Sequence, residues 1–219
     1  MHLCAGFFLI DRSILLILSG YNNKIMAIIR ELNGITPKMG KNCFIAENAA
    51  IIGDVTMGDD CSIWYSAVLR GDVNTIKIGD RVNIQDGAVL HTLYQRSICE
   101  IGNDVSVGHN AIIHGAKVGN NVLVGMGAIL MDNAVIPDNT IIAAGAVVLS
   151  NSVLEPGVYA GIPAKKVKEG SEAIGQAAYN NAQGYMMYKE WFLKGTDAEG
   201  KEAEGTEAVQ GTAAAGNAE

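Results

Sequence analysis

The sequence is poor in charged, aromatic and proline residues. Asp, Glu, Lys and Arg make up 18% of the 219 residues, aromatic residues make up 6%, and four residues are proline. The formal net charge is −7, and residues 195–219 hold six acids and one base, so the rest of the chain is close to neutral. Because nucleic-acid-binding domains carry a basic excess, we expect no nucleic-acid partner.

The sequence also lacks long apolar runs and paired cysteines. The runs Phe7–Ile10 and Ile14–Leu18 are each too short to span a bilayer, so we expect no membrane association. A charged pair separates them and no clear cleavage site follows, which is unlike a signal peptide. We interpret residues 1–25 as an N-terminal extension that precedes the true start at Met26. The four cysteines form no Cys-x-x-Cys pair, which favours a reducing, cytoplasmic location.

The sequence does contain a repeat of six residues. Between Ile45 and Leu154 an aliphatic residue recurs every six positions, with a shift after Leu69 and an interruption at about residues 93–100. A small residue usually stands four positions after each aliphatic one, as Val73 does after Leu69, and we expect these residues to point inward as well. This period fits neither a helix nor an ordinary strand, and it is typical of a parallel β-helix. We therefore predict an all-β domain over residues 26–168, with about six coils stacked about 4.8 Å apart.

Two segments of different composition follow the repeat. Ser171 can cap a helix whose first turn contains Glu172, so we predict a C-terminal α-helix over residues 169–194. Its mostly apolar stripe would consist of Ile174, Ala178, Asn181, Tyr185, Tyr188 and Phe192. Residues 195–219 are mainly Gly, Ala, Glu and Thr. They offer too little apolar surface to bury, so we predict a disordered acidic tail.

Three of the four histidines lie between residues 84 and 114. In the predicted β-helix, His91 and His114 each follow an inward aliphatic residue and are one coil apart. Both should therefore point outward on the same face, separated by about 4.8 Å. Two imidazoles at that separation can share a zinc ion at about 2.1 Å from each nitrogen. We predict a metal site there rather than two solvated histidines.

His109 does not fit the same site within one chain. It lies five residues before His114 on the preceding face, and an extended path of that length covers about 16 Å. A neighbouring molecule could supply it, and a threefold axis would then create three equivalent sites. The repeat thus predicts a homotrimer with the metal between subunits.

Three stretches carry a resemblance to a known family. They are Leu69-Arg-Gly-Asp-Val-Asn74, Arg81-Val-Asn-Ile-Gln-Asp-Gly-Ala-Val-Leu-His-Thr92 and Val105-Ser-Val-Gly-His-Asn-Ala-Ile-Ile-His-Gly115. On these stretches the chain resembles the γ-class carbonic anhydrases, specifically their short cytoplasmic branch. The resemblance implies a left-handed β-helix, although the general crossover rule favours the opposite hand. It also implies a homotrimer that binds zinc, or iron or cobalt in some members, through His91 and His114 of one subunit and His109 of the next.

The same resemblance implies roles for five further residues. Gln85 would orient the metal-bound hydroxide or the substrate, and Tyr185 would help to position CO2 or the bound solvent. Arg70, Asp72 and Asp86 match the family's interface charge network, in which the arginine also holds bicarbonate. The alternatives are that Arg70 only forms a buried ion pair with Asp72 or Asp86, and that Tyr185 only packs the helix.

The implied reaction is the reversible hydration of CO2 to bicarbonate. Zinc lowers the pKa of a bound water from 15.7 to about 7, so hydroxide is available at neutral pH to attack CO2. A proton must then leave the site. The family's archetype uses glutamates for this step, one of them directly after the Asp72 position, where this chain has Val73. The short loop of residues 93–100 offers only Glu100, which puts the speed of turnover in question.

Two other functions share the predicted fold. A hexapeptide-repeat acyltransferase would use one histidine as a base and bind an acyl donor between coils, but it gives no reason for three histidines at these positions. An inactive γ-type scaffold would keep the metal for trimer assembly alone. The residues do not separate a slow enzyme from such a scaffold.

Overall fold

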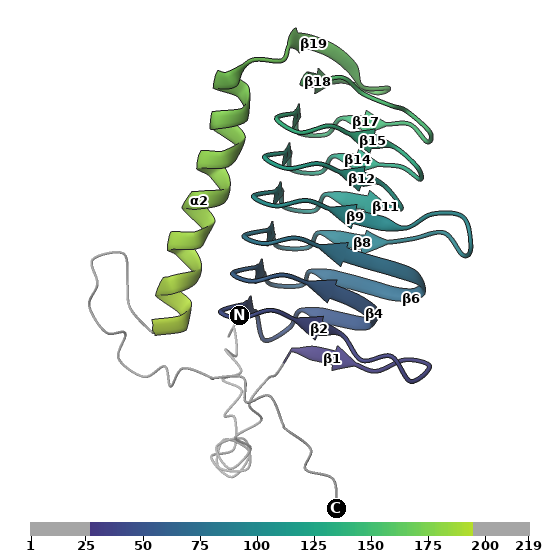
Figure 1. Ribbon diagram of the computed structural model, residues 1–219, viewed down its shortest axis with the longest axis vertical. Helices are drawn as coiled ribbons and strands as arrows, with labels where there is room; N and C mark the ends of the chain where they lie inside the picture. Colours follow the sequence, from purple (N-terminus) through teal and green to yellow (C-terminus); the bar gives the residue numbers. More distant parts are fainter. Residues whose placement is uncertain (1–26, 195–219) are drawn as a thin grey trace, which may run out of the picture.

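The computed structural model describes residues 27–194, which form a parallel β-helix with one long helix along its side (Figure 1). The predictions for residues 1–25 and 195–219 fall outside the described residues. The strands are β1 (Ile28–Arg30), β2 (Lys38–Met39), β3 (Phe44–Ile45), β4 (Ala50–Met57), β5 (Ser62–Ile63), β6 (Val68–Ile78), β7 (Asn83–Ile84), β8 (Val89–His91), β9 (Cys99–Ile101), β10 (Ser106–Val107), β11 (Ile112–His114), β12 (Lys117–Val118), β13 (Leu123–Val124), β14 (Ile129–Leu130), β15 (Val135–Ile136), β16 (Ile141–Ile142), β17 (Val147–Val148), β18 (Gly157–Ala160) and β19 (Lys165–Glu169). The helix is α2 (Glu172–Lys194).

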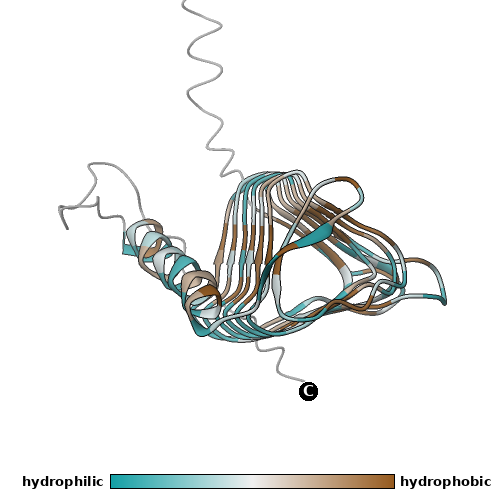
Figure 2. Ribbon diagram, turned by 90° about the horizontal axis from the view of Figure 1, so that it is seen from above, coloured by the Kyte–Doolittle hydropathy of each residue, from teal (hydrophilic) through white to brown (hydrophobic). Residues whose placement is uncertain are grey.

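Each strand of the coils pairs in parallel with the strand one coil away rather than with its neighbour in sequence. The order β6-β8-β11-β14-β17 makes one face, and the order β3-β5-β7-β10-β13-β16 makes another. Seen along the stack, the coils form a triangle with α2 outside one side (Figure 2). The hairpin of β18 and β19 is antiparallel and ends the stack. These findings confirm the predicted fold class.

The interior is filled by the residues of the six-residue repeat. The aliphatic positions from Ile51 to Val148 are buried, and most of the small residues four positions later are buried as well. Val73 is an exception, because the register between β4 and β6 shifts after Gly53 and places Ile76 beside Val55 in the core. The predicted inward position of Val73 is therefore wrong.

The C-terminal helix packs against the coils along a face that differs in part from the predicted stripe. Asn181 is exposed, and Ala182, one position later, is buried instead. The side chain of Lys189 is completely buried, and its ammonium group donates to Asn42 O and to Asp60 Oδ1, each at 2.8 Å. This contact fixes α2 to the first coils.

Candidate metal centre

His91 and His114 lie opposite each other on neighbouring strands. They end β8 and β11, which pair in parallel with His91 in register with His114, as the repeat predicted. The two ring centroids are 5.2 Å apart, and His91 Nδ1 lies 3.2 Å from His114 Nε2. One nitrogen of each ring thus faces the other ring.

A carboxylate forms a hydrogen bond with the other nitrogen of each ring. Asp72 Oδ1 lies 2.9 Å from His91 Nε2, and the two oxygens of Asp132 lie 2.9 and 3.0 Å from His114 Nδ1. An ionised carboxylate only accepts hydrogen bonds, so these ring nitrogens carry the protons. The carboxylates come from opposite sides of the pair, because β6 and β14 flank β8 and β11 in the sheet.

The two facing nitrogens are therefore both lone-pair donors. Two lone pairs 3.2 Å apart repel unless a cation or a shared proton lies between them. Two nitrogen ligands of one tetrahedral zinc ion are about 3.4 Å apart, given bonds of about 2.1 Å. The spacing and chemistry of His91 and His114 fit two of the ligands of such an ion.

His109 lies apart from this pair, at the corner between β10 and β11. Its Nδ1 lies 2.9 Å from Asp86 Oδ2, and its Nε2 lies 3.5 Å from the hydroxyl of Tyr185 on α2. Each of the three histidines thus has one nitrogen bound by its own aspartate. Within residues 27–194, no three His, Cys, Asp or Glu side chains come together as a metal site.

The predicted charge network divides into two parts within the chain. Arg70 forms an ion pair with Asp72, whereas Asp86 pairs with His109. Partial burial acts to raise the pKa of Asp72, but hydrogen bonds from His91 and Arg70 outweigh it, so this pKa lies below its ordinary value. The side chain of Arg70 is 43% exposed, which leaves part of the guanidinium open to an anion.

Gln85 and Tyr185 both lie beside His109. The Gln85 side chain is buried, its Oε1 accepts from the backbone N–H of His109 at 3.2 Å, and its Nε2 donates to Asn83 Oδ1 at 3.0 Å. Burial and the nearby charge of Asp86 raise the pKa of Tyr185. Tyr185 thus borders Nε2 of His109, and Gln85 holds the backbone of the same histidine.

The sequence reasoning missed Asp132 and Ser97. Ser97 is buried, and its hydroxyl donates to Asp132 Oδ1 at 2.6 Å. The repeat gave only a partial signal for Asp132, because the position equivalent to His114 one coil on is Met131, and Asp132 follows it directly. Ser97 belongs to a loop outside the repeat, and no spacing rule would have found it.

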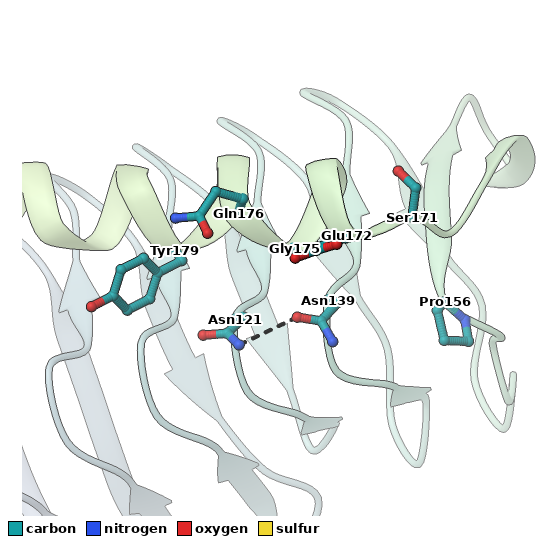
Figure 3. Close-up of a pocket in the computed structure, with 8 residues that line it drawn as sticks. All are labelled: Asn121, Asn139, Pro156, Ser171, Glu172, Gly175, Gln176 and Tyr179. Atoms are coloured by element: carbon teal, nitrogen blue, oxygen red, sulfur yellow. Dashed lines mark hydrogen bonds between the residues drawn. The ribbon is translucent and has the colours of Figure 1, made fainter.

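A depression of about 530 Å³ lies elsewhere, between the start of α2 and the coils. Figure 3 shows Asn121, whose amide donates to Asn139 Oδ1 at 3.3 Å, below Gln176 and Tyr179 of the helix. Its lining contains none of the three histidines or their aspartates. The packing of the helix on stacked asparagine corners accounts for it.

The comparisons with known proteins agree with this architecture. The family model of the bacterial transferase hexapeptide, in six repeats, matches residues 36–71 and 115–150. A carbonic anhydrase of Geobacillus kaustophilus is 48% identical over 146 residues, which is 66% of this chain and 80% of that protein. Gamma carbonic anhydrase 2, mitochondrial, of Arabidopsis thaliana is 44% identical over 106 residues, which is 46% of this chain and 38% of that protein. The chain belongs to the γ-class carbonic anhydrase family.

A solved structure supports the fold assignment within this family. The hexapeptide transferase family protein of Anaplasma phagocytophilum is 38% identical and has a TM-score of 0.71, covering 76% of this chain and 98% of that protein. Together with the hexapeptide-repeat family match, this likeness supports the left-handed parallel β-helix as the fold of this chain. In residues 27–194 no helix combines the length and the apolar character needed to cross a membrane.

Proposed function

We propose that the protein catalyses the reversible hydration of CO2 to bicarbonate as a homotrimer, with one zinc ion at each subunit interface. Iron or cobalt would occupy the same ligand set. The observation that carries this proposal is the pair of facing lone-pair nitrogens, His91 Nδ1 and His114 Nε2, with their outer nitrogens bound to Asp72 and Asp132. Membership of the γ-class family supports the choice of reaction.

The ligands would come from two subunits. His91 and His114 of one chain provide two nitrogens, and the Nε2 of His109 from a neighbouring chain provides the third. Asp86 supports this role, since it binds His109 Nδ1 and leaves Nε2 without a proton. Bound zinc would lower the pKa of a coordinated water to about 7 and so supply hydroxide at neutral pH.

The other residues would orient and bind the substrates. Tyr185 lies beside His109 Nε2, where its hydroxyl can position CO2 in the interface. Gln85 fixes the backbone of His109 and so acts on the placement of the third ligand. The exposed part of the Arg70 guanidinium can hold the bicarbonate anion, while Asp72 keeps the arginine beside His91.

Proton removal is expected to limit the rate. Glu100, the acid that the loop offers, forms an ion pair with Lys117 at 3.1 Å and approaches Lys77 at 4.0 Å. The carboxylate of Glu100 is thus engaged by two lysines instead of being free to carry a proton from the site. We therefore expect slow turnover that rises with the concentration of an external buffer.

The direct test is stopped-flow measurement of CO2 hydration on protein with measured zinc content, before and after chelation. We expect activity that follows the zinc content and returns when zinc is restored. The rival activity is acyl transfer, which the transferase hexapeptide repeats favour. Consumption of acetyl-CoA with no CO2 hydration would replace our proposal with that one, and zinc binding with neither activity would indicate a scaffold.

Mixed trimers test how the ligands divide between chains. His109→Ala and His114→Ala chains should each bind no zinc as pure trimers. When the two chains are co-expressed, every 2:1 trimer has one junction where intact His91 and His114 meet an intact His109. We expect one zinc per mixed trimer, and zero zinc in all mixtures would contradict a shared site.

A further inference from the structure

A chain of hydrogen bonds leads from the loop at residues 92–98 to the histidine pair. Ser97 Oγ accepts from the backbone N–H of Leu93 at 2.9 Å and donates to Asp132 Oδ1 at 2.6 Å. Asp132 in turn binds His114 Nδ1. The Ser97 hydroxyl has both its donor and its acceptor engaged, so its orientation is fixed.

The loop that carries Ser97 is itself tied down. The backbone N–H groups of Arg96 and Ser97 donate to Leu93 O, and Asn74 Nδ2 donates to Ser97 O at 2.8 Å. The side chain of Ser97 is 4% exposed. A buried hydroxyl on a loop whose backbone is held in this way is a rigid support for a carboxylate.

Gly115 leaves the space that this arrangement needs. It follows His114 directly and adopts φ of +61°, a conformation that favours glycine. A Cβ at this position would overlap both Ser97 and Asp132. The close approach of the loop to Asp132 therefore depends on the glycine beside the histidine.

We propose that Asp132 is a positioning residue that fixes the tautomer and ring orientation of His114, and that Ser97 holds Asp132 in place for this task. This inference rests on the proposed function in one respect, namely that His114 Nε2 binds a metal ion. An outer-shell partner of a ligating histidine both orients the ring and raises its basicity, and its loss weakens metal binding by about 10- to 100-fold. Asp132 would act through His114 and would not touch the substrate.

The first measurement is zinc affinity, obtained by competition with a chelator on the full chain. We expect Asp132→Asn and Asp132→Ala to bind zinc about 10- to 100-fold more weakly than the wild type. Ser97→Ala should lose only a few fold, because Asp132 remains but is less well held. The control is Asp138→Asn. Asp138 accepts a hydrogen bond from the backbone N–H of Asn120, and at the equivalent position on earlier coils Asn103 and Asn120 accept the same kind of bond, so an asparagine fits there. The control should bind zinc as the wild type does.

The second measurement is the tautomer of His114 in the zinc-free protein, read from the ¹⁵N shifts of its ring. The wild type should carry the proton on Nδ1, and Asp132→Ala should show a mixture of tautomers or the Nε2–H form. Circular dichroism establishes that each variant is folded, and Asp132→Asn keeps the test open if the alanine variant does not fold. Wild-type zinc affinity in the folded Asp132 variants, or an unchanged Nδ1–H tautomer in Asp132→Ala, would overturn the proposal.

The two measurements also separate this inference from the proposed function. A wild-type protein that binds no zinc would contradict the proposed function, while the tautomer measurement would still decide the role of Asp132. Normal zinc binding and CO2 hydration in the Asp132 variants would leave the function intact and remove the positioning role.

Discussion

The coils that carry the histidines are irregular, whereas the coils that follow them are regular. Paired residues on successive coils are 21 residues apart at Leu69 and Leu90, and 23 apart at Leu90 and Ile113. Beyond Ile113 the separations are 17 residues to Leu130 and a further 18 to Val148. The extra residues leave the triangle as excursions, one within β6 and one at residues 92–98. Figure 1 shows a loop standing out beside β9.

The residues that stack the coils thus differ from the residues that surround the histidines. In regular and irregular coils alike, side chains at one corner accept backbone N–H groups from the coil before, as Asn103 does from Asp80 and Asn120 does from Asn103. In the irregular coils, the excursions bring Asp72 and Ser97 to the histidine face. Departures from a local pattern are expected where a protein places function ahead of regularity. Asp132 is a regular-coil residue whose side chain reaches back to His114.

The largest expected effect comes from replacing a histidine of the pair. His114→Ala removes a proposed zinc ligand, so we expect loss of zinc and of CO2 hydration by more than about 100-fold, beyond the cost of losing an outer-shell partner. Met131 occupies the equivalent outward position one coil further on, after Leu130, the register partner of Ile113. Met131→Ala should therefore leave both properties unchanged. Metal analysis measures the zinc content of the two variants, and stopped-flow kinetics measures their CO2 hydration. A similar loss in both variants would contradict the distinction between the two kinds of coil.

The six-residue period was sufficient to predict the β-helix and the His91–His114 pairing, because every residue in a coil has its place fixed by register. Register applied forward from His114 leads to Met131 and so misses Asp132, which lies one position further on. It could not find Ser97, since an excursion has no period. It failed at Val73 for the same reason, because Ile76 takes the inward place after the β6 excursion.

The helix shows a second limit of sequence reasoning. Sequence reasoning predicts that a lysine beside an apolar stripe is exposed, since buried lysines are rare unless they are paired. Lys189 is buried because Asn42 O and Asp60, from two different coils, both meet its ammonium group. These partners are more than 120 residues away in sequence, and only the folded stack brings them to the helix.

A smaller effect is expected from Lys189, and it concerns stability rather than the site. Lys189→Ala leaves Asp60 without its partner, so we expect the free energy of unfolding to fall by about 3 kcal/mol. This is the lower end of the range for a broken buried pair, because the Asp60 side chain remains 33% exposed. Lys194→Ala removes an exposed pair with Glu190 and should cost about 0.3–0.5 kcal/mol. Urea unfolding measures both.

The Lys189→Ala variant also sharpens the comparison of the coils. His91 and His114 lie on a face that Lys189 does not touch, so Lys189→Ala should keep its affinity for zinc under conditions in which it is folded. Weaker zinc binding in folded Lys189→Ala, at the level expected for the Asp132 variants, would mean that the first coils and the helix also determine the geometry of the pair.

The smallest effect concerns a thiol in the first coils, where no histidine lies. A hydrogen bond from Cys61 lowers the pKa of Cys43 to about 7, against the opposing effect of burial and with help from the positive charge of Lys189. Burial raises the pKa of Cys99 to about 12, and the pKa of Cys61 is also raised, first by its hydrogen bond with Cys43. Since the thiolate is the reactive form, Cys43 should be alkylated selectively among these three.

The alkylation rate of Cys43 should rise as pH increases and reach half its maximum near pH 7, because the thiolate fraction grows through its pKa. Lys189→Met should move this midpoint upward, since it removes a charge that favours the thiolate. Iodoacetamide labelling with peptide mapping follows Cys43 alone, and Cys43→Ser is the control. The alkylated wild type should still bind zinc with unchanged affinity, because the perturbed thiol belongs to the packing of the first coils. Loss of zinc on alkylation of Cys43 would show instead that a group outside the irregular coils takes part in the site.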